Sequence, residues 1–397
     1  LCQTLHLIFS GTLFSITHIN KKSRDEAKMT AHAQDIGLIA SKQQIEIAPA
    51  LVRAARSSGK NPLSIWLDYR KLKRGRGRIR FYEYMLYELY DQKRWSDEER
   101  SRFVSAHIHW PISNACNDTS WWAVTEDKWL SSSFLSRHGL PVPAIAAVFD
   151  QGPRSFPDVP KLETAEDLRS FFAAGPAFPL FAKPVRGMWS AGAFRINGCT
   201  DSHILIEGHD PVTFEELAEK IFGDQSYLIQ ECLTPHSFFD GLTGAIGTVR
   251  SLNLIGKNGL NVPFTALKLP MQSNVADNFW RPGNLLSQLD PETGTVLTIV
   301  DAQDGTRVAY DSLPGSARKL IGEQLPMWSE LRAMNEKVAL LHGANRYGST
   351  DIALTEDGPV VVEVNSGCAF ELMQMATGKG LLSDEMLAFF RESGAKI

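Results

Sequence analysis

The feature that most constrains this chain is a strand–turn–strand pattern near its C-terminal end, residues 350–365. Two apolar stretches flank Asp357-Gly358, a dipeptide that is typical of hairpin turns. Glu363 and Asn365 are two residues apart, so both lie on the same face of the second strand. The register of the hairpin decides whether Asp351, on the first strand, joins them on that face.

Loop length sets this register. A loop of Asp357 and Gly358 alone would place Asp351 opposite Val364, on the other face. A three-residue loop, 356–358, places Asp351 opposite Glu363 and gives the glycine the left-handed position, so we predict this loop. Two carboxylates and an amide then converge, and their oxygens suit Mg²⁺ shared with phosphates better than zinc. The alternative is an ordinary hairpin with polar ends, in which the two carboxylates would repel each other.

A second pattern brings a lysine to the end of an apolar strand. Lys183 closes the stretch 179–183, and the glycine-containing loop 186–192 follows it. Backbone N–H groups freed by glycine can hold a phosphate, and a lysine adds a point charge. The Gly-Lys-Ser/Thr ending of a P-loop is missing. By itself, the segment fits a surface hairpin equally well.

Two more predicted strands carry polar residues. The stretch 227–231 is apolar until Gln230 and Glu231, where backbone groups could bind the edge of an adenine ring, although a plain buried strand also explains it. Arg250 shares a strand face with Ile246 and Leu252. An arginine there needs an anionic partner, which is either a phosphate or a structural carboxylate.

Composition excludes several classes of protein. The chain has 397 residues, 43% of them hydrophobic and 22% charged, which is ordinary for a globular protein of about two or three domains. A formal net charge of −4 argues against a general nucleic-acid binder. The five cysteines form no CxxC pair, so we expect no disulfide framework or zinc site and a cytoplasmic location. No apolar run is long enough for a membrane span.

The N-terminal third raises two questions. We expect residues 1–28 to be a disordered or non-native extension before Met29, because basic residues follow the apolar stretch 1–20 instead of preceding it; a weak signal peptide or a membrane-surface anchor is the alternative. Residues 29–120 have a mainly helical pattern. Within them lies a basic run, which is either a solvated loop or a docking site for an acidic acceptor. Its cations are Arg70, Lys71, Lys73, Arg74, Arg76, Arg78 and Arg80.

Strands and helices are interleaved after residue 121, which predicts an α/β (α+β) fold. We expect a mostly helical segment over 312–343 and a last helix over 383–393. Asp127-Lys128, ahead of a short helical pattern, adds another lysine before the strands.

The order and spacing of these patterns resemble the ATP-grasp superfamily and, most closely, its sugar-transfer-associated family, from about Leu63 to the C-terminus. The resemblance implies an ATP-grasp fold, in which two α+β subdomains clasp ATP. Residues 121–235 would be the small subdomain with a lid and a hinge, and 236–397 the C-terminal subdomain with the magnesium site. The lid departs from the glycine-richest lids of the superfamily, because Met188 and Trp189 are bulky.

The resemblance also implies roles for individual residues. Arg250 and Lys183 would be catalytic, and His236 or Asp240 would contact the ribose. The other expected nucleotide-binding residues are Lys128, Lys183, Gln230, Glu231, Cys232, Leu233 and Asn278. The expected metal ligands are Asp351, Glu363 and Asn365.

The activity that the resemblance implies is an ATP- and Mg²⁺-dependent carboxylate ligase. An acyl phosphate would be attacked by an amine or another nucleophile, with two Mg²⁺ ions for which Mn²⁺ is expected to substitute. The partners would be a small carboxylate and a nucleophilic acceptor, an anionic sugar of polysaccharide biosynthesis being one candidate, with no nucleic acid involved. The alternatives are a phosphotransferase acting on a hydroxyl and a non-catalytic protein that binds a nucleotide or a glycan.

Overall fold

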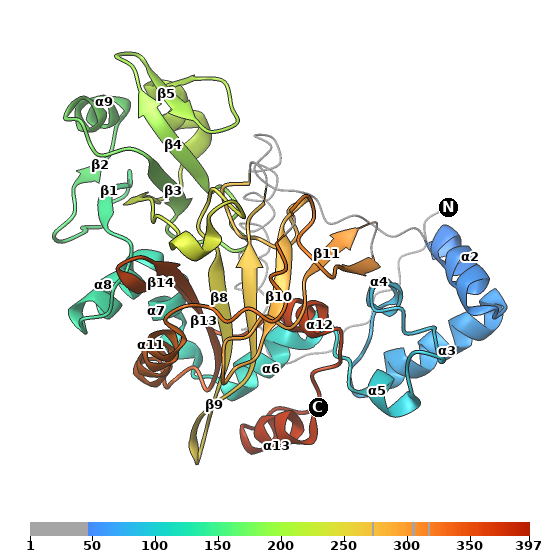
Figure 1. Cartoon of the computed structure of the whole chain (residues 1–397). Coiled ribbons are helices and arrows are strands. Elements are labelled where there is room, and N and C mark those ends of the chain that lie inside the picture. The colour runs from blue at the N-terminus through green and yellow to red at the C-terminus, as the bar shows by residue number, and fades with distance from the viewer. Residues whose placement is uncertain (1–46, 272–273, 304–305, 317) are drawn as a thin grey trace, which may run out of the picture.

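The computed structural model describes residues 47–271, 274–303, 306–316 and 318–397. The expectation about residues 1–28 lies outside these ranges. Figure 1 shows two β-sheets, with the helices of the N-terminal region beside the larger one. The structure confirms the α/β class and the helical character of the described part of the N-terminal region.

The N-terminal region consists of short helices whose ends follow from local sequence. Asn61 caps the second helix by accepting a hydrogen bond from the Ser64 N–H, and Pro62 occupies its first turn, where a missing N–H costs nothing. Gly75 follows the last residue of that helix. The region contains α2 (Ile47–Ser58), α3 (Pro62–Arg74), α4 (Phe81–Leu86), α5 (Asp97–Ser101), η1 (Ala106–Ile108), α6 (His109–Cys116) and η2 (Thr119–Trp121).

The smaller sheet has seven strands in the order β2-β1-β7-β3-β4-β5-β6. Only β1 and β2 pair in parallel; the other neighbours are antiparallel. Its strands are β1 (Ile145–Phe149), β2 (Lys161–Leu162), β3 (Leu180–Pro184), β4 (Phe194–Cys199), β5 (His203–Ile206), β6 (Val212–Thr213) and β7 (Tyr227–Glu231). Its core includes residues of α9 (Ala165–Ala173) and of α10 (Phe214–Glu216), which continues as the π-helix η3 (Leu217–Phe222). The helices α7 (Trp122–Glu126) and α8 (Lys128–Arg137), which precede this sheet in the chain, contact β14 (Gly358–Asn365) of the larger sheet.

The chain crosses to the larger sheet through residues 232–247, which include η4 (Ser237–Phe239). This sheet is antiparallel, with the order β12-β11-β10-β9-β8-β13-β14. Its strands are β8 (Thr248–Gly256), β9 (Gly259–Leu269), β10 (Leu285–Leu289), β11 (Val300–Gln303), β12 (Thr306–Ala309), β13 (Tyr347–Thr355) and β14 (Gly358–Asn365). The helices α11 (Trp328–Leu341), α12 (Phe370–Thr377) and α13 (Asp384–Glu392) complete the chain.

Each face of the larger sheet packs into its own hydrophobic core. Leu252 and Ala266 point to the face that α12 and the N-terminal helices cover, and they join one cluster with Phe370 and Tyr84. The residues that alternate with them, such as Val249 and Leu267, point to the opposite face and pack against α11. The first face matters for function, because Arg250 lies directly opposite Ala266.

Two predictions about elements need correction. The segment 312–343 is helical only over Trp328–Leu341, because Pro326 lacks the N–H that a continuing helix needs and Met327 adopts a left-handed conformation just before the helix. The strands β9 to β12 were not predicted, although they build half of the larger sheet. Within the described ranges, no helix combines the length and the hydropathy needed to cross a bilayer.

Candidate active site

The β13–β14 hairpin places Asp351 directly opposite Glu363, as predicted, but by a different route. Thr355 pairs with Gly358, so the loop has two residues, 356–357, and the predicted three-residue loop is wrong. A two-residue loop of this kind would leave Asp351 out of register with Glu363. The register shifts between Asp351 and Ile352, where Val362 on the partner strand is left over as a β-bulge. The bulge therefore brings the two carboxylates to the same face.

Asp351 lies within a dense set of charges on the larger sheet. The Arg250 guanidinium donates two hydrogen bonds to its carboxylate, one of 2.7 Å from Nε to Oδ1. Lys268 Nζ lies 3.2 Å from Oδ2. Burial alone would raise the pKa of Asp351, but Arg250 and Lys268 lower it to about 2. Burial alone would lower the pKa of Arg250, and Asp351 more than reverses this effect.

Glu363 has a different cationic partner. Its Oε1 lies 3.2 Å from Lys128 Nζ at the start of α8, which joins the hairpin to the segment that precedes the smaller sheet. Burial would raise the pKa of Glu363, and the positive charge of Lys128 lowers it below its usual value. Each of the two hairpin carboxylates therefore has its own cation. The repulsion that two unpaired carboxylates would cause in an ordinary hairpin is offset in this way.

Asn365, two residues beyond Glu363, lies opposite Ser349 on the same face of the hairpin. Its Nδ2 is buried and has no hydrogen-bond partner among the described residues. Asp351 accepts two hydrogen bonds from Arg250 and a contact from Lys268, which leaves about one of its four lone-pair sites. The oxygens that stay available belong mainly to Glu363 and Asn365, and such a set of carboxylate and amide oxygens fits Mg²⁺.

Lys183, the next-to-last residue of β3, is a buried cation whose ammonium group has no direct partner among the described residues. Only 8% of the residue is exposed, and its ammonium group makes no hydrogen bond or ion pair within the part of the chain that the structure describes. Burial, followed by the positive charge of Lys128, lowers its pKa to about 8, although Glu363, Asp277 and Asp351 act in the opposite direction. A buried ammonium group with no partner has free donors for an anion.

Two members of this charged cluster were missed from the sequence. Lys268 in β9 binds Asp277 (3.0 Å) as well as Asp351, and Asp277 also accepts a hydrogen bond from the Thr248 hydroxyl. The available signal was a single lysine in the apolar run Ala266–Leu269, just before Pro270. Together, four cations (Lys128, Lys183, Arg250 and Lys268) face three carboxylates (Asp277, Asp351 and Glu363), so the cluster carries one excess positive charge.

The loop 186–192 is hydrogen-bonded to α8 and to the segment that connects β9 and β10. Lys128 Nζ donates a hydrogen bond to the Gly187 carbonyl (2.7 Å), and Asn278 Nδ2 donates one to the Trp189 carbonyl (2.7 Å). Trp189 and Ser190 both have positive φ angles (61° and 54°), a conformation that costs non-glycine residues energy. Trp189 is 65% exposed. Asn278 therefore lies next to the loop, whose phosphate contacts remain a prediction.

The residues expected to hold the nucleoside follow β7 into the crossing segment. Gln230 is buried and donates weakly to the Pro143 carbonyl (3.4 Å), while Glu231 is exposed at the strand end. Cys232 and Leu233 are half-buried, and burial raises the pKa of the Cys232 thiol to about 11. His236 accepts a hydrogen bond from the Phe238 N–H through Nδ1.

Asp240 is exposed at the end of η4. Its carboxylate makes no hydrogen bond or ion pair to the described residues. His236 Nε2, by contrast, lies 3.7 Å from Glu356 in the hairpin loop. The hairpin and the crossing segment are thus in contact.

One face of α6 holds the loop that follows the hairpin. Asn117 Nδ2 donates to the Tyr347 carbonyl (2.8 Å), and its Oδ1 accepts from the Tyr347 N–H (2.8 Å). Ser113, one turn earlier, donates its hydroxyl to the Ser366 carbonyl. His109, another turn earlier, lies against Gly367, where a Cβ atom would come within 2.6 Å of Nε2. The spacing of four residues places all three on one side of α6.

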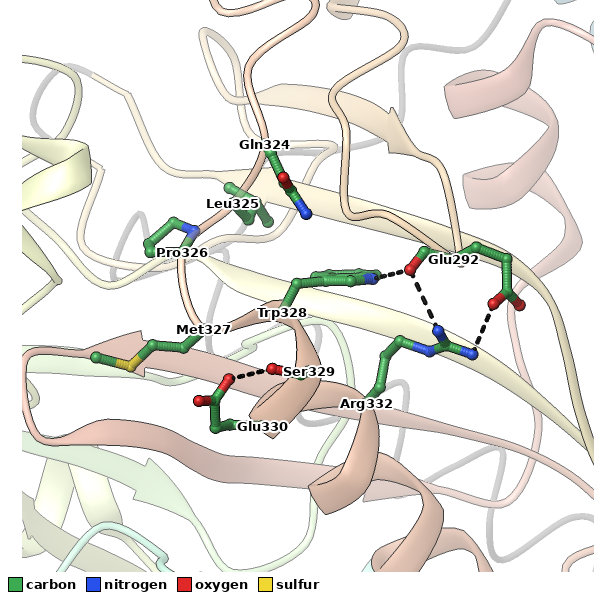
Figure 2. Close-up of a pocket in the computed structure, with 9 residues that line it drawn as sticks. All are labelled: Glu292, Gln324, Leu325, Pro326, Met327, Trp328, Ser329, Glu330 and Arg332. Carbon is green, nitrogen blue, oxygen red and sulfur yellow. Dashed lines mark hydrogen bonds and ion pairs between the residues drawn. The ribbon is translucent and has the colours of Figure 1, made fainter.

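A separate pocket of about 600 Å³ lies at the start of α11 (Figure 2). The indole of Trp328 and the guanidinium of Arg332 both donate to the Glu292 carbonyl, which closes one side of the pocket. None of the charged residues of the cluster between the two sheets lines it. We therefore place the candidate active site at that cluster.

Comparison with known proteins identifies the family. Residues 112–387 match the sugar-transfer associated ATP-grasp family, and the chain belongs to it. No protein among those with curated descriptions matches the chain.

Solved structures with a similar fold include the VanG D-Ala:D-Ser ligase from Enterococcus faecalis, at 16% identity and a TM-score of 0.40, covering 69% of this chain and 64% of that one. A biotin carboxylase from Campylobacter jejuni has 11% identity and a TM-score of 0.40, with 71% and 49% covered. The D-alanine–D-alanine ligase from Bacillus anthracis has 13% identity and a TM-score of 0.38, with 70% of each chain covered. The match thus spans less than two thirds of the first two of these proteins.

Proposed function

We propose that this protein is an ATP- and Mg²⁺-dependent ligase that joins a carboxylate to an amine or another nucleophile. The observation that carries the proposal is the charged cluster between the two sheets, where four cations face three carboxylates. The triphosphate of ATP carries several negative charges, and this excess of cations lies beside a glycine-containing loop. The family to which the chain belongs supports the same activity.

We propose a separate binding role for each group of residues in the cluster and around it. Lys128, Lys183 and Arg250 would bind and orient the phosphates, and Asn278 would hold the lid loop over them. Gln230, Glu231, Cys232 and Leu233 would bind the adenine, and His236 or Asp240 the ribose. Asp351, Glu363 and Asn365 would hold Mg²⁺, with Mn²⁺ as a substitute. The metal supplies charge neutralisation on the triphosphate oxygens.

In the proposed reaction, a carboxylate oxygen of the substrate attacks the γ-phosphorus, and the bond to the β–γ bridging oxygen breaks to release ADP. The nucleophile then attacks the acyl carbon, loses a proton, and displaces phosphate that retains the attacking carboxylate oxygen. Arg250, already oriented by Asp351, would stabilise the charge on the transferring group. An acceptor from polysaccharide biosynthesis remains the substrate class that we propose, and a cytoplasmic location would supply the ATP.

The test is a screen of carboxylates with amino acids and amino sugars for substrate-stimulated release of ADP, followed by mass spectrometry. The expected products are ADP, phosphate and a new amide or ester. With a carboxylate labelled with ¹⁸O, one labelled oxygen should appear in the phosphate. A phosphorylated acceptor without free phosphate would identify a phosphotransferase instead, and ATP binding without turnover would identify a binding protein.

A further inference from the structure

The structure divides the basic run of residues 70–80 into two parts with different surroundings. Lys71, Lys73 and Arg74 lie in the last turn of α3, where positive charge is stabilised by the helix dipole. Lys71 also pairs with Asp97 (3.1 Å). The first part of the run therefore has a structural explanation.

The second part forms a fixed turn. Gly77 packs against Phe103 so closely that a Cβ atom would lie 1.8 Å from the Phe103 carbonyl oxygen. The Gly77 carbonyl accepts a hydrogen bond from the Ser105 N–H (2.8 Å). The next residue, Arg78, has a φ angle of 54°, which a non-glycine residue adopts only when its surroundings impose it. The backbone thus sets the direction in which Arg78 leaves the turn.

Arg78 and Arg80 are two cations whose side chains have no anionic partner among the described residues. Both are exposed, and neither side chain forms an ion pair or hydrogen bond with the residues that the structure describes. His107 lies close to them: burial, followed by the charges of Arg80 and Arg78, lowers its pKa. Arg78 and Arg80 are two residues apart and both act on His107, so an anion bound beside them would offset their charge.

A chain of contacts connects this turn to α12, the helix that follows the hairpin. Glu83 is fully buried and accepts hydrogen bonds from the Arg80 N–H (2.7 Å) and the Ala106 N–H (2.7 Å). The Tyr82 hydroxyl bridges Glu83 and Glu371. Glu371 lies in the first turn of α12, six residues after Asn365.

A second contact reaches the loop 366–369, between the hairpin and α12. His109, two residues after His107, packs on Gly367, which lies between the hairpin and α12. The turn with Arg78 and Arg80 is therefore linked to α12 through Tyr82 and Glu371, and the helix that follows His107 contacts the loop between the hairpin and α12. A group bound there would lie on the side of the larger sheet that also carries Arg250.

We propose that Arg78 and Arg80 bind a phosphate group of the acceptor substrate, and so select a phosphorylated acceptor for the ligase. Two guanidinium groups can each bind phosphate through paired N–H donors, which a lysine cannot. The proposal rests on the ligase function for the identity of the acceptor, but not for the binding of phosphate. The phosphate belongs either to a soluble sugar phosphate or to a lipid-linked one.

The test uses the full chain and occupies the nucleotide site first. The non-hydrolysable analogue AMP-PNP with Mg²⁺ is titrated until saturation, and inorganic phosphate is then titrated by calorimetry. Arg78→Gln with Arg80→Gln should weaken the binding of phosphate at least fivefold. The matched control, Lys73→Gln with Arg74→Gln, removes two charges from the same run and should change the affinity less than twofold.

Two results would overturn the proposal: wild-type protein that does not bind phosphate under these conditions, or the two double variants losing affinity equally. Failure of the ligase proposal is measured separately, in the turnover screen described above, because the binding of phosphate to Arg78 and Arg80 requires no turnover. Cosedimentation with phosphatidylcholine vesicles that contain phosphatidic acid, lost in the Arg78/Arg80 variant, would assign the phosphate to a lipid-linked acceptor. Phosphate binding without cosedimentation would assign it to a soluble one.

Discussion

Arg250 in the larger sheet and Lys183 in the smaller one are two largely buried cations with opposite surroundings. Arg250 is paired with Asp351 through two hydrogen bonds. The ammonium group of Lys183 has no hydrogen bond or ion pair within the described ranges, and its pKa falls to about 8. The pair keeps Arg250 charged and oriented without a ligand, whereas the ammonium group of Lys183 has no such partner among the described residues. The larger sheet is therefore preorganised, and the smaller one is electrostatically incomplete.

The strongest way to break this contrast is to remove the partner of Arg250. Asp351→Asn leaves a largely buried guanidinium without its carboxylate, so we expect the free energy of unfolding to fall by about 3 kcal/mol. Turnover should be lost as well. Chemical denaturation and ADP release measure the two effects.

The matched control for this variant is Glu363→Gln in the same hairpin. The cations of the two pairs are equally buried, but Glu363 is 28% exposed whereas Asp351 is 2% exposed. Lys128 also keeps its hydrogen bond to the Gly187 carbonyl, so the loss of stability should be smaller, about 1 kcal/mol. Turnover should be lost here too. Equal destabilisation by the two substitutions would contradict the division of charges described above.

A substitution of Lys183 tests the other side of the comparison, the buried cation in the smaller sheet. Lys183→Met removes a buried charge that is unpaired among the described residues, so we expect the nucleotide-free protein to gain roughly 2–3 kcal/mol of stability at pH 7 while activity is lost. The folded pKa of Lys183 is about 8 and the unfolded value is about 10.5. Between these values the folded state loses its proton first, so wild-type stability rises relative to the variant and the gap closes by about pH 10.5.

Denaturation curves of both proteins at pH 7 and pH 10 measure this gap. Lys183→Arg is the control, because arginine stays charged at both pH values. A constant difference between wild type and Lys183→Met across this range would mean that Lys183 is not the group that titrates.

The smallest change in stability should come from the hydrogen bond between Asn278 and the loop 186–192. Asn278→Ala removes the hydrogen bond to the Trp189 carbonyl, an exposed interaction, so the stability should change by less than about 1 kcal/mol. The KM for ATP should rise severalfold, because the lid loop loses its tie to the larger sheet. Asn274→Ala, in the same segment but bonded to Pro282 and Asn284, should leave the KM unchanged. Equal KM values for the two variants would show that this tie does not hold the lid.

The sequence predicts local features of the site better than long-range ones. The pairing of Asp351 with Glu363 is confirmed, but the loop is one residue shorter than expected and a bulge at Val362 compensates. A bulge has no composition signal in a run of valines, so periodicity alone does not reveal it. Lys268 was missed for another reason: its neighbours in β8 and β10 are distant in sequence, and only strand pairing shows that it reaches Asp351.

The division of the basic run shows the same limit. Seven cations in eleven residues form one feature in the sequence, and their order does not distinguish a helix end from a ligand site. The structure separates them, because α3 ends at Arg74 and the buried Glu83 fixes the turn that follows.

The buried amide of Gln374 limits where this chain can be truncated for expression. Its Oε1 accepts from the Val104 N–H (2.8 Å) and its Nε2 donates to the Val104 carbonyl (2.8 Å), as a neighbouring strand would. Phe103 and Tyr84 pack in the same core as Phe370 and Met373. A chain that began at the family boundary, near residue 112, would expose this core and leave the Gln374 amide unpaired. Such a fragment should aggregate, so the helical region and the ATP-grasp region have to be expressed as one piece.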